Sequence, residues 1–281
     1  MRLGQIRFEN KLTAALFEGG VARPIPGYST VDLIRKAETE AAPLDKLIEQ
    51  MAARHGEVCA PSIPLCPVEV WGCGCTYEVS ASLAGVEHGA GRGLYDHVLT
   101  HERPDVFFKG TARVCVGPGQ PIGIRFDSKF TAPGSELALV LGRKGRVLGY
   151  TLANDVSARD IGRENPLYLP QSRIFTGCCA LGPVIVTTGE IPDVSLLEMT
   201  CTILRGDQKL FEGSVSLARL ARRLETLIEY LLRANPVPAG SVLLTGTGII
   251  VPEQAALQPG DTVTIRAPEI GELVNTAAVV Q

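Results

Sequence analysis

The sequence has 281 residues and a formal net charge of −3. A slightly acidic chain of this kind lacks the basic surface that nucleic-acid binding requires. No apolar run approaches the ~18 residues of a membrane-spanning helix, and the first residues, MRLGQIRFENK, show no signal-peptide pattern. We therefore expect a cytoplasmic protein whose partner is a small molecule, with no nucleic acid and no membrane.

The first part of the chain predicts a small α/β unit. Residues 2–25 favour two strands around the turn at Glu18, Gly19 and Gly20. Two amphipathic helices are predicted near 29–38 and 43–54, and Pro43 opens the second of them.

Three prolines, Pro61, Pro64 and Pro67, then form a stiff link into a β-rich region. Length alone allows one large domain or two. We predict an N-terminal cap domain over residues 1–65 and a catalytic domain over residues 66–281.

A β-hairpin follows in the middle of the chain. Leu137 to Leu141 form an apolar run of strand length, and turn residues lead into a second strand over Val147 to Leu152. Glu136 enters the first strand and Asp155 leaves the second, so both carboxylates lie at one rim of a sheet, where they could share a hard cation. The alternative is that Glu136 is an edge charge and Asp155 a loop cap.

Two further segments have distinct patterns. Ser216 to Ala234 place leucines at helical spacing and predict one packing helix. In ENPLYLPQ at 164–171, Pro166 and Pro170 disfavour a regular helix, so we expect an ordered loop over the site.

The eight cysteines show no paired C-x-x-C spacing, which disfavours a structural zinc site. In a cytosolic protein they are most simply small apolar core residues. Cys73 and Cys75 flank the strand predicted to border the pocket, and a nucleophilic role for either stays open.

Long ordered strings along most of the chain resemble the fumarylacetoacetate hydrolase superfamily, and within it the 2-keto-3-deoxyarabinonate dehydratase branch. The resemblance implies an α+β fold, a mixed β-roll with a small N-terminal α/β cap, commonly assembled as a homodimer. The strings are WGCGCTYEVS at 71–80, ERPDVFFKG at 102–110, VGPGQPIGIRFDS at 116–128, the stretch from 134 to 171, CCALGP at 178–183 and LLTGTGI at 243–249.

The resemblance also implies a divalent cation, Mg²⁺ or Mn²⁺, held by a Glu-x-Glu pair and an Asp. The second Glu matches Glu136 and the Asp matches Asp155, but the first Glu falls on Gly134. Because hard-cation affinity depends on ligand charge, losing one carboxylate predicts a loss of roughly tenfold to a thousandfold. A weak site, a site rescued by another acid or no metal site remain open.

Four residues are predicted to be catalytic. The resemblance places an acid–base group near Glu87, where His88 is an alternative proton carrier or a solvated loop residue. Lys109 ends an apolar strand and points either to the pocket or to solvent. Arg173 replaces a usual Lys, and a guanidinium favours binding a carboxylate over proton transfer.

The predicted substrate-binding residues come from three segments of the chain. Thr245, Gly246 and Thr247 follow a predicted strand, and small residues there let backbone amides approach a carboxylate; a tight turn is the alternative. The resemblance adds residues from the other two segments, namely Tyr77, Tyr168 and Gln171.

Three functions follow from these observations. The first is a metal-assisted lyase or hydrolase that forms an enolate from a small 2-oxo acid or β-dicarbonyl compound. The second is a metal-independent enzyme of specialised metabolism that performs a cyclisation, dehydration or condensation on a larger, more apolar substrate. The third is a non-catalytic binding protein. We predict a divergent enzyme of the superfamily, with sugar-acid dehydration itself less favoured than other enolate chemistry.

Overall fold

β-Strands dominate the protein, whose computed structural model describes residues 1–78 and 94–281. The predicted catalytic residues Glu87 and His88 lie outside the described residues. The larger sheet runs in spatial order through β4 (Glu57–Val58), β3 (Val21–Pro24), β2 (Lys11–Glu18), β1 (Arg2–Phe8), β13 (Cys179–Thr187), β11 (Val147–Asp155), β10 (Ser135–Leu141), β16 (Ser241–Leu244), β5 (Val70–Gly74) and β6 (Asp105–Gly110), and β7 (Cys115–Val116) also pairs with β13.

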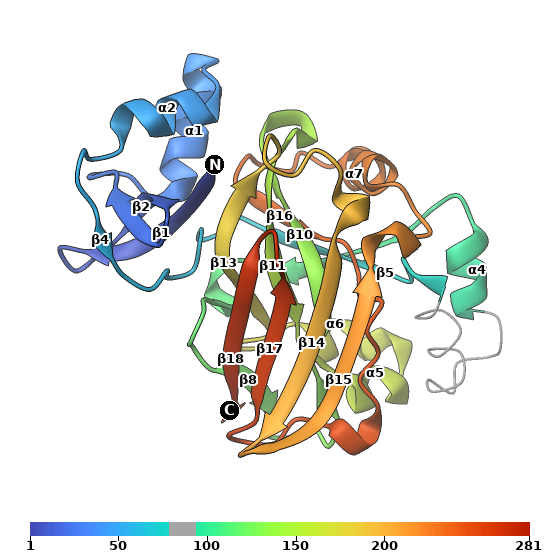
Figure 1. Ribbon diagram of the computed structural model, residues 1–281. Helices are drawn as coiled ribbons and strands as arrows, with labels where there is room; N and C mark the ends of the chain where they lie inside the picture. The colour runs from blue at the N-terminus through green and yellow to red at the C-terminus, as the bar shows by residue number, and fades with distance from the viewer. Residues whose placement is uncertain (79–93) are drawn as a thin grey trace.

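A second sheet packs against the first, with β13, β11 and β10 contacting strands of the facing layer. Figure 1 shows β14, β15, β17 and β18 of this layer in orange and red across the front of the molecule. In spatial order it contains β15 (Gln208–Ser216), β14 (Glu198–Arg205), β17 (Thr262–Ala267), β18 (Gly271–Val280) and β8 (Ile122–Arg125), and a separate short pair joins β9 (Thr131–Ala132) to β12 (Ser157–Ala158).

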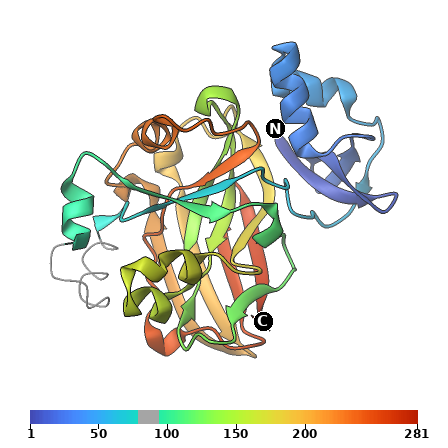
Figure 2. The same ribbon diagram turned by 180° about the vertical axis from the view of Figure 1, so that it is seen from behind.

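The helices are few and lie at the margins of the sheets. Figure 2 shows the pair α5 and α6 beside the strands, seen from behind. No helix of the described residues is both long and apolar enough to cross a membrane. The α-helices are α1 (Thr30–Glu40), α2 (Leu44–Met51), α4 (Leu94–Thr100), α5 (Arg159–Glu164), α6 (Leu169–Arg173) and α7 (Leu224–Leu232).

The core lies between the two sheets, as the apolar runs of the sequence indicate. Every residue of β10 is buried, because the strand is covered on both faces and paired on both edges by β11 and β16. The predicted hairpin is confirmed, and so is the mixed α+β class. Its register places Glu136 opposite Ala153, close to Asp155 at the end of β11.

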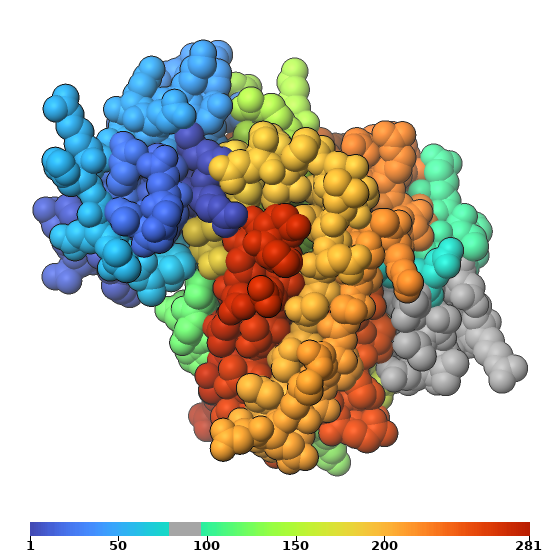
Figure 3. All heavy atoms as spheres, in the orientation of Figure 1, coloured from blue at the N-terminus to red at the C-terminus, as the bar shows by residue number. Residues whose placement is uncertain are grey.

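The N-terminal region contains three strands, and the prediction of two was wrong. The missed turn is Glu9 and Asn10, both with positive φ, and it joins β1 to β2. The predicted turn at Gly19 and Gly20 instead joins β2 to β3. Because β1 also pairs with β13, these strands continue the larger sheet, and Figure 3 shows the blue N-terminal residues packed against that edge.

Two helix predictions also require correction. The predicted helix over residues 216–234 shortens to α7, because Leu220 forms a β-bridge with Tyr77 and the Ala221 N–H donates to the Thr76 carbonyl. The predicted loop at 164–171 contains short helical turns instead. Pro166 and Pro170 stand in the first turns of these helices, where a missing N–H costs nothing.

Candidate active site

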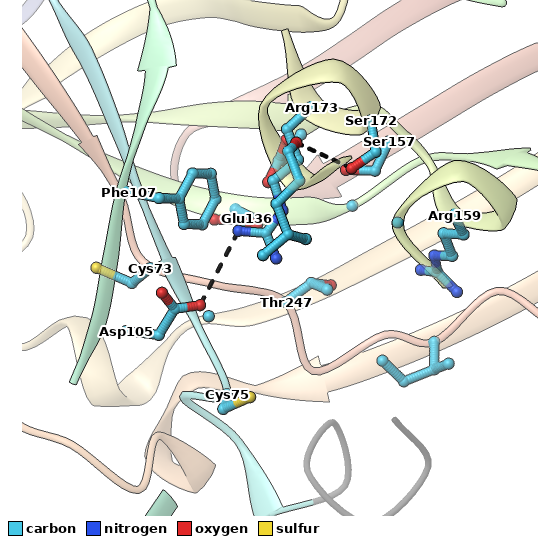
Figure 4. A pocket seen from close by; sticks show the side chains of 16 residues that line it. Cys73, Cys75, Asp105, Phe107, Glu136, Ser157, Arg159, Ser172, Arg173 and Thr247 are labelled. Atoms are coloured by element: carbon cyan, nitrogen blue, oxygen red, sulfur yellow. Dashed lines mark hydrogen bonds and ion pairs between the residues drawn. The ribbon is translucent and has the colours of Figure 1, made fainter. Parts of the chain in front are cut away.

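A pocket opens where the ends of β5, β6, β10 and β11 meet helices α5 and α6. Figure 4 shows its lining side chains converging from these elements. Its volume is about 160 Å³. The lining residues are Cys73, Gly74, Cys75, Asp105, Phe107, Gly134, Glu136, Asp155, Ser157, Arg159, Gly162, Leu169, Ser172, Arg173, Thr247 and Ile250.

Glu136 is the deepest carboxyl group of the pocket and is only 3% exposed. The Gly246 N–H donates a hydrogen bond to its Oε2 at 2.6 Å. Burial raises the pKa of Glu136 well above its ordinary value, and the nearby Asp155 carboxylate raises it further. The Gly246 N–H and the cations Lys109 and Arg173 lower this pKa but only in part.

Lys109 is completely buried, so the surface alternative for this residue is wrong. Its Nζ forms an ion pair with Asp155 Oδ1 and donates a hydrogen bond to the Val156 carbonyl at 2.8 Å. Burial lowers the pKa of Lys109, but the Asp155 carboxylate outweighs burial and the net direction is upward. A charged ammonium therefore stands behind the pocket wall and fixes Asp155.

Gly134 lies against Asp155, and the backbone has closed around it. The Asp155 N–H donates to the Gly134 carbonyl at 2.8 Å, and the Gly134 N–H donates to Asn154 Oδ1 at 3.1 Å. A Cβ atom at position 134 would lie 2.8 Å from the Asp155 carbonyl oxygen. The glycine therefore leaves no enlarged cavity at position 134.

The donor set fits a divalent cation as an incomplete site. Glu136 and Asp155 present carboxyl groups to one pocket. Burial is the main cause of the raised pKa of Glu136, and the Asp155 charge adds a repulsion that a cation would relieve. Within the described residues no third Asp, Glu, His or Cys joins them in a metal-binding group. The sequence-predicted ligands are therefore brought together, with the remaining positions left to water or substrate oxygens.

The wall of the pocket formed by β5 and β6 depends on two glycines of β5. Gly72 pairs with Phe107 and Gly74 with Asp105, and a Cβ on either glycine would clash with the side chain of its partner, at 2.4 Å and 2.2 Å. Alternate glycines thus let Phe107 and Asp105 lie flat across β5. This wall faces Arg173.

Arg173 extends from the end of α6 into the pocket (Figure 4). Its guanidinium carbon lies 3.9 Å from the centre of the Phe107 ring, and Nη1 lies 3.9 Å from Asp105 Oδ2. The first distance is a close cation–π contact, whereas the second exceeds a hydrogen bond.

The predicted substrate-binding residues take different positions. Thr247 lines the pocket, whereas Thr245 is buried and donates its hydroxyl to the Leu137 carbonyl at 3.0 Å. Tyr77 is buried outside the lining, and burial raises the pKa of its phenol. Tyr168 and Gln171 are exposed and are not among the described lining residues.

All eight cysteines are free, and the prediction of core residues holds for the four that are buried, namely Cys73, Cys178, Cys179 and Cys201. Cys73 and Cys75 line the pocket as predicted from their strand. Burial raises the pKa of Cys73 well above its ordinary value, and burial followed by the Asp105 charge raises the pKa of Cys75 to about 12. Neither thiol is activated as a nucleophile at neutral pH.

Sequence reasoning missed Asp105, Phe107, Ser157 and Ser172 as pocket residues. One signal was present for the first two, because glycines alternate in WGCGC and indicate close approach of neighbouring side chains. The two serines lack such a signal, since β12 places Ser157 and α6 places Ser172 in the pocket only after the chain has folded.

Three comparisons with known proteins agree on the family. Residues 78–278 match the family described as fumarylacetoacetate (FAA) hydrolase, C-terminal. A 2-dehydro-3-deoxy-D-arabinonate dehydratase of Saccharolobus solfataricus is 46% identical over 215 residues, which cover 75% of this chain and 72% of the relative. A protein of Haloferax volcanii named "Probable 2-keto-3-deoxyxylonate dehydratase" is 37% identical over 252 residues, covering 90% and 84%.

The solved structures support the same relationship. A 2-keto-3-deoxy-D-arabinonate dehydratase complexed with magnesium and 2,5-dioxopentanoate superposes with a TM-score of 0.84 and 34% identity, with both chains covered over 100% of their length. These relatives are lyases, and the predicted superfamily, branch and enzyme class are confirmed.

Proposed function

The chain belongs to the fumarylacetoacetate hydrolase family, and on this premise we propose that it is a lyase that acts on a small 2-oxo acid or β-dicarbonyl compound through an enolate. The observation that carries the proposal is the buried cluster of Glu136, Lys109 and Asp155 at the base of a pocket that Arg173 also enters. The dehydratases similar to this chain support the reaction class.

The reaction has two steps in this proposal. A proton leaves the carbon next to the oxo group, and the electron pair forms the enolate. The enolate electrons then form a carbon–carbon double bond and break the C–O bond at the following carbon, and a proton returned to the departing hydroxyl group lets it leave as water. We assign proton transfer to Glu87 or His88, which are the acid–base candidates of the sequence.

Charges on the chain itself favour this enolate. The cations Lys109 and Arg173 both lower the pKa of Glu136, so their field reaches the place where negative charge develops. Lys109 is fixed by Asp155 and by the Val156 carbonyl, and it needs no reorientation during the reaction. A dication held by Glu136 and Asp155 would supply Lewis-acid polarisation of the oxo group.

The size of the pocket favours a small substrate over the larger apolar one of the second hypothesis. Its volume of about 160 Å³ is below the range of roughly 300–1,000 Å³ that is typical of drug-sized ligands. Gly134 adds no space, because the Asp155 backbone fills the position that a side chain would take.

Turnover tests the proposal directly. Purified protein with Mg²⁺ or Mn²⁺ would be offered 2-keto-3-deoxy sugar acids, other small 2-oxo acids and β-dicarbonyl compounds, with products followed by mass spectrometry. We expect loss of water or of a carbon fragment from at least one 2-oxo acid, and at least a hundredfold less turnover in Asp155→Ala. Turnover of none of these compounds, with or without metal, would overturn the proposal.

A further inference from the structure

The guanidinium of Arg173 lies in the pocket against the ring of Phe107. It carries five N–H donors, yet no hydrogen bond from them reaches another described residue. Its side chain is 22% exposed, so the group is partly desolvated on the Phe107 ring while one edge faces the pocket. The guanidinium is a planar fork of N–H donors, and such a group can form two parallel hydrogen bonds to one carboxylate.

The wall beneath Arg173 is shaped for this arrangement. The glycines of β5 allow Phe107 to lie flat, and the ring gives the guanidinium a surface to stack on instead of a polar partner. Asp105 lies beside it at 3.9 Å, which is close enough to attract the cation but too far for a hydrogen bond. The ion pair is therefore weak and exchangeable.

The charges of the pocket favour an anion at this point. Lys109 already compensates Asp155, and Arg159 adds a second guanidinium to the pocket lining. Asp105 is 37% exposed, so its charge is screened by water and competes poorly with a carboxylate that binds both edges of the fork.

We propose that Arg173, stacked on Phe107, binds the substrate's carboxylate directly and that Asp105 is the internal competitor which this carboxylate displaces. The inference rests on the proposed function and names one requirement of the substrate, a carboxylate separated from the buried Glu136 and Lys109 cluster by the reacting carbons. Recognition of this carboxylate at Arg173 needs no metal ion.

Binding of pyruvate to chelator-treated protein tests the inference, with methyl pyruvate as the uncharged probe. Ligand-observed NMR in the presence of EDTA measures the dissociation constants without requiring turnover. We expect pyruvate to bind and methyl pyruvate to bind at least tenfold more weakly. Arg173→Gln should weaken pyruvate binding at least tenfold, and Arg173→Lys should weaken it less, because an ammonium keeps the charge but loses the fork.

Arg163→Gln is the matched control. Arg163 lies on neighbouring α5, outside the lining, and pairs with Glu253, so this variant makes the same change of charge without altering the pocket. Asp105→Asn should tighten pyruvate binding a few fold, an effect that a purely structural role would not produce.

Two results would overturn the inference. Pyruvate binding that is equal in wild type, Arg173→Gln and Arg163→Gln would remove the role of Arg173, provided thermal melting shows all three folded. Weaker binding in Asp105→Asn would remove the competition. Pyruvate bound through Arg173 together with failed turnover would refute only the proposed reaction, whereas turnover with unchanged binding in Arg173→Gln would refute only this inference.

Discussion

The two ends of the pocket differ in how much of their polar capacity the protein already uses. At the deep end, Glu136 accepts from Gly246, and Lys109 is bound to Asp155 and Val156. At the outer end, Arg173 and Asp105 are half-exposed and separated by 3.9 Å. The contrast teaches that the deep end is a fixed electrostatic framework, whereas the outer end keeps its partners exchangeable for a ligand.

Removing the buried cation should have the largest effect. Lys109→Met leaves Asp155 without its partner beside Glu136, and breaking a buried ion pair from one side costs about 3–5 kcal/mol. Urea unfolding measures this loss in the free energy of unfolding.

The double variant Lys109→Met/Asp155→Leu is the control for that change. It removes both charges, and we expect it to recover a large part of the lost stability. A loss below about 1 kcal/mol in Lys109→Met alone would mean that the deep end is not the fixed framework described above.

Metal affinity should respond next, since Glu136 and Asp155 are the two carboxyl groups that the deep end offers to a cation. Calorimetric titration of Mn²⁺ into chelator-treated protein should show weak binding that Asp155→Ala abolishes. Gly134→Glu should tighten binding by roughly tenfold to a thousandfold if the backbone adjusts. Its Cβ would lie 2.8 Å from the Asp155 carbonyl, so a lower melting temperature should accompany the gain.

If wild type shows no binding heat at millimolar Mn²⁺, the assignment of Glu136 and Asp155 as a cation site is contradicted. Tighter binding in Gly134→Glu that does not change the products formed would show that residue 134 affects metal affinity but does not set the reaction. Gly134→Ala separates the two effects, because it adds the Cβ contact without a carboxylate.

The two ends also differ in how far the sequence predicted them. Glu136 and Asp155 could be placed because they terminate paired strands of one short hairpin, and the pairing fixes which ends meet. The complete burial of Lys109 could not be predicted, since it depends on the position of β6 at the far edge of the sheet beside β5.

Contacts between distant segments account for the remaining errors. Arg173 was predicted from the resemblance, but Asp105 was missed because no local pattern links α6 to the start of β6. The long helix failed for the same reason, since pairing of Leu220 with Tyr77 overrides a helical spacing of leucines. The domain boundary near residue 65 remains a prediction.

Glu136→Gln separates charge from geometry at the deep end. The variant keeps an oxygen that accepts from Gly246 and removes an ionisable group whose pKa lies well above 4.5. In wild type, the Glu136 carboxyl group loses its proton at a lower pH in the unfolded chain than in the folded protein. The free energy of unfolding therefore falls as pH rises from about 4.5 toward the folded-state pKa. In Glu136→Gln, this fall in the free energy of unfolding is absent.

Unfolding curves at pH 5 and pH 8 check this prediction. Wild type and Glu136→Gln should differ by less than about 1 kcal/mol at pH 5, and the variant should gain relative to wild type toward pH 8. A wild type that becomes the more stable protein at pH 8 would show that the Glu136 carboxylate is favoured in the folded state, which is opposite to the assigned direction.

The smallest expected effect concerns Cys75, which reports on the charges of the outer end. Burial and then Asp105 raise its pKa to about 12, whereas Arg173 lowers it. Only about 1 in 10,000 molecules then carries the reactive thiolate at pH 8, so alkylation by iodoacetamide should be far slower than at the exposed Cys66 and should rise tenfold per pH unit. Peptide mass spectrometry measures both rates in one sample.

Asp105→Asn should accelerate labelling of Cys75 and Arg173→Gln should slow it, with the labelling rate of Cys66 unchanged. Equal rates in both variants would mean that the charges of Asp105 and Arg173 do not reach the thiol, and hence that the outer end is more strongly screened by water than its exposure indicates.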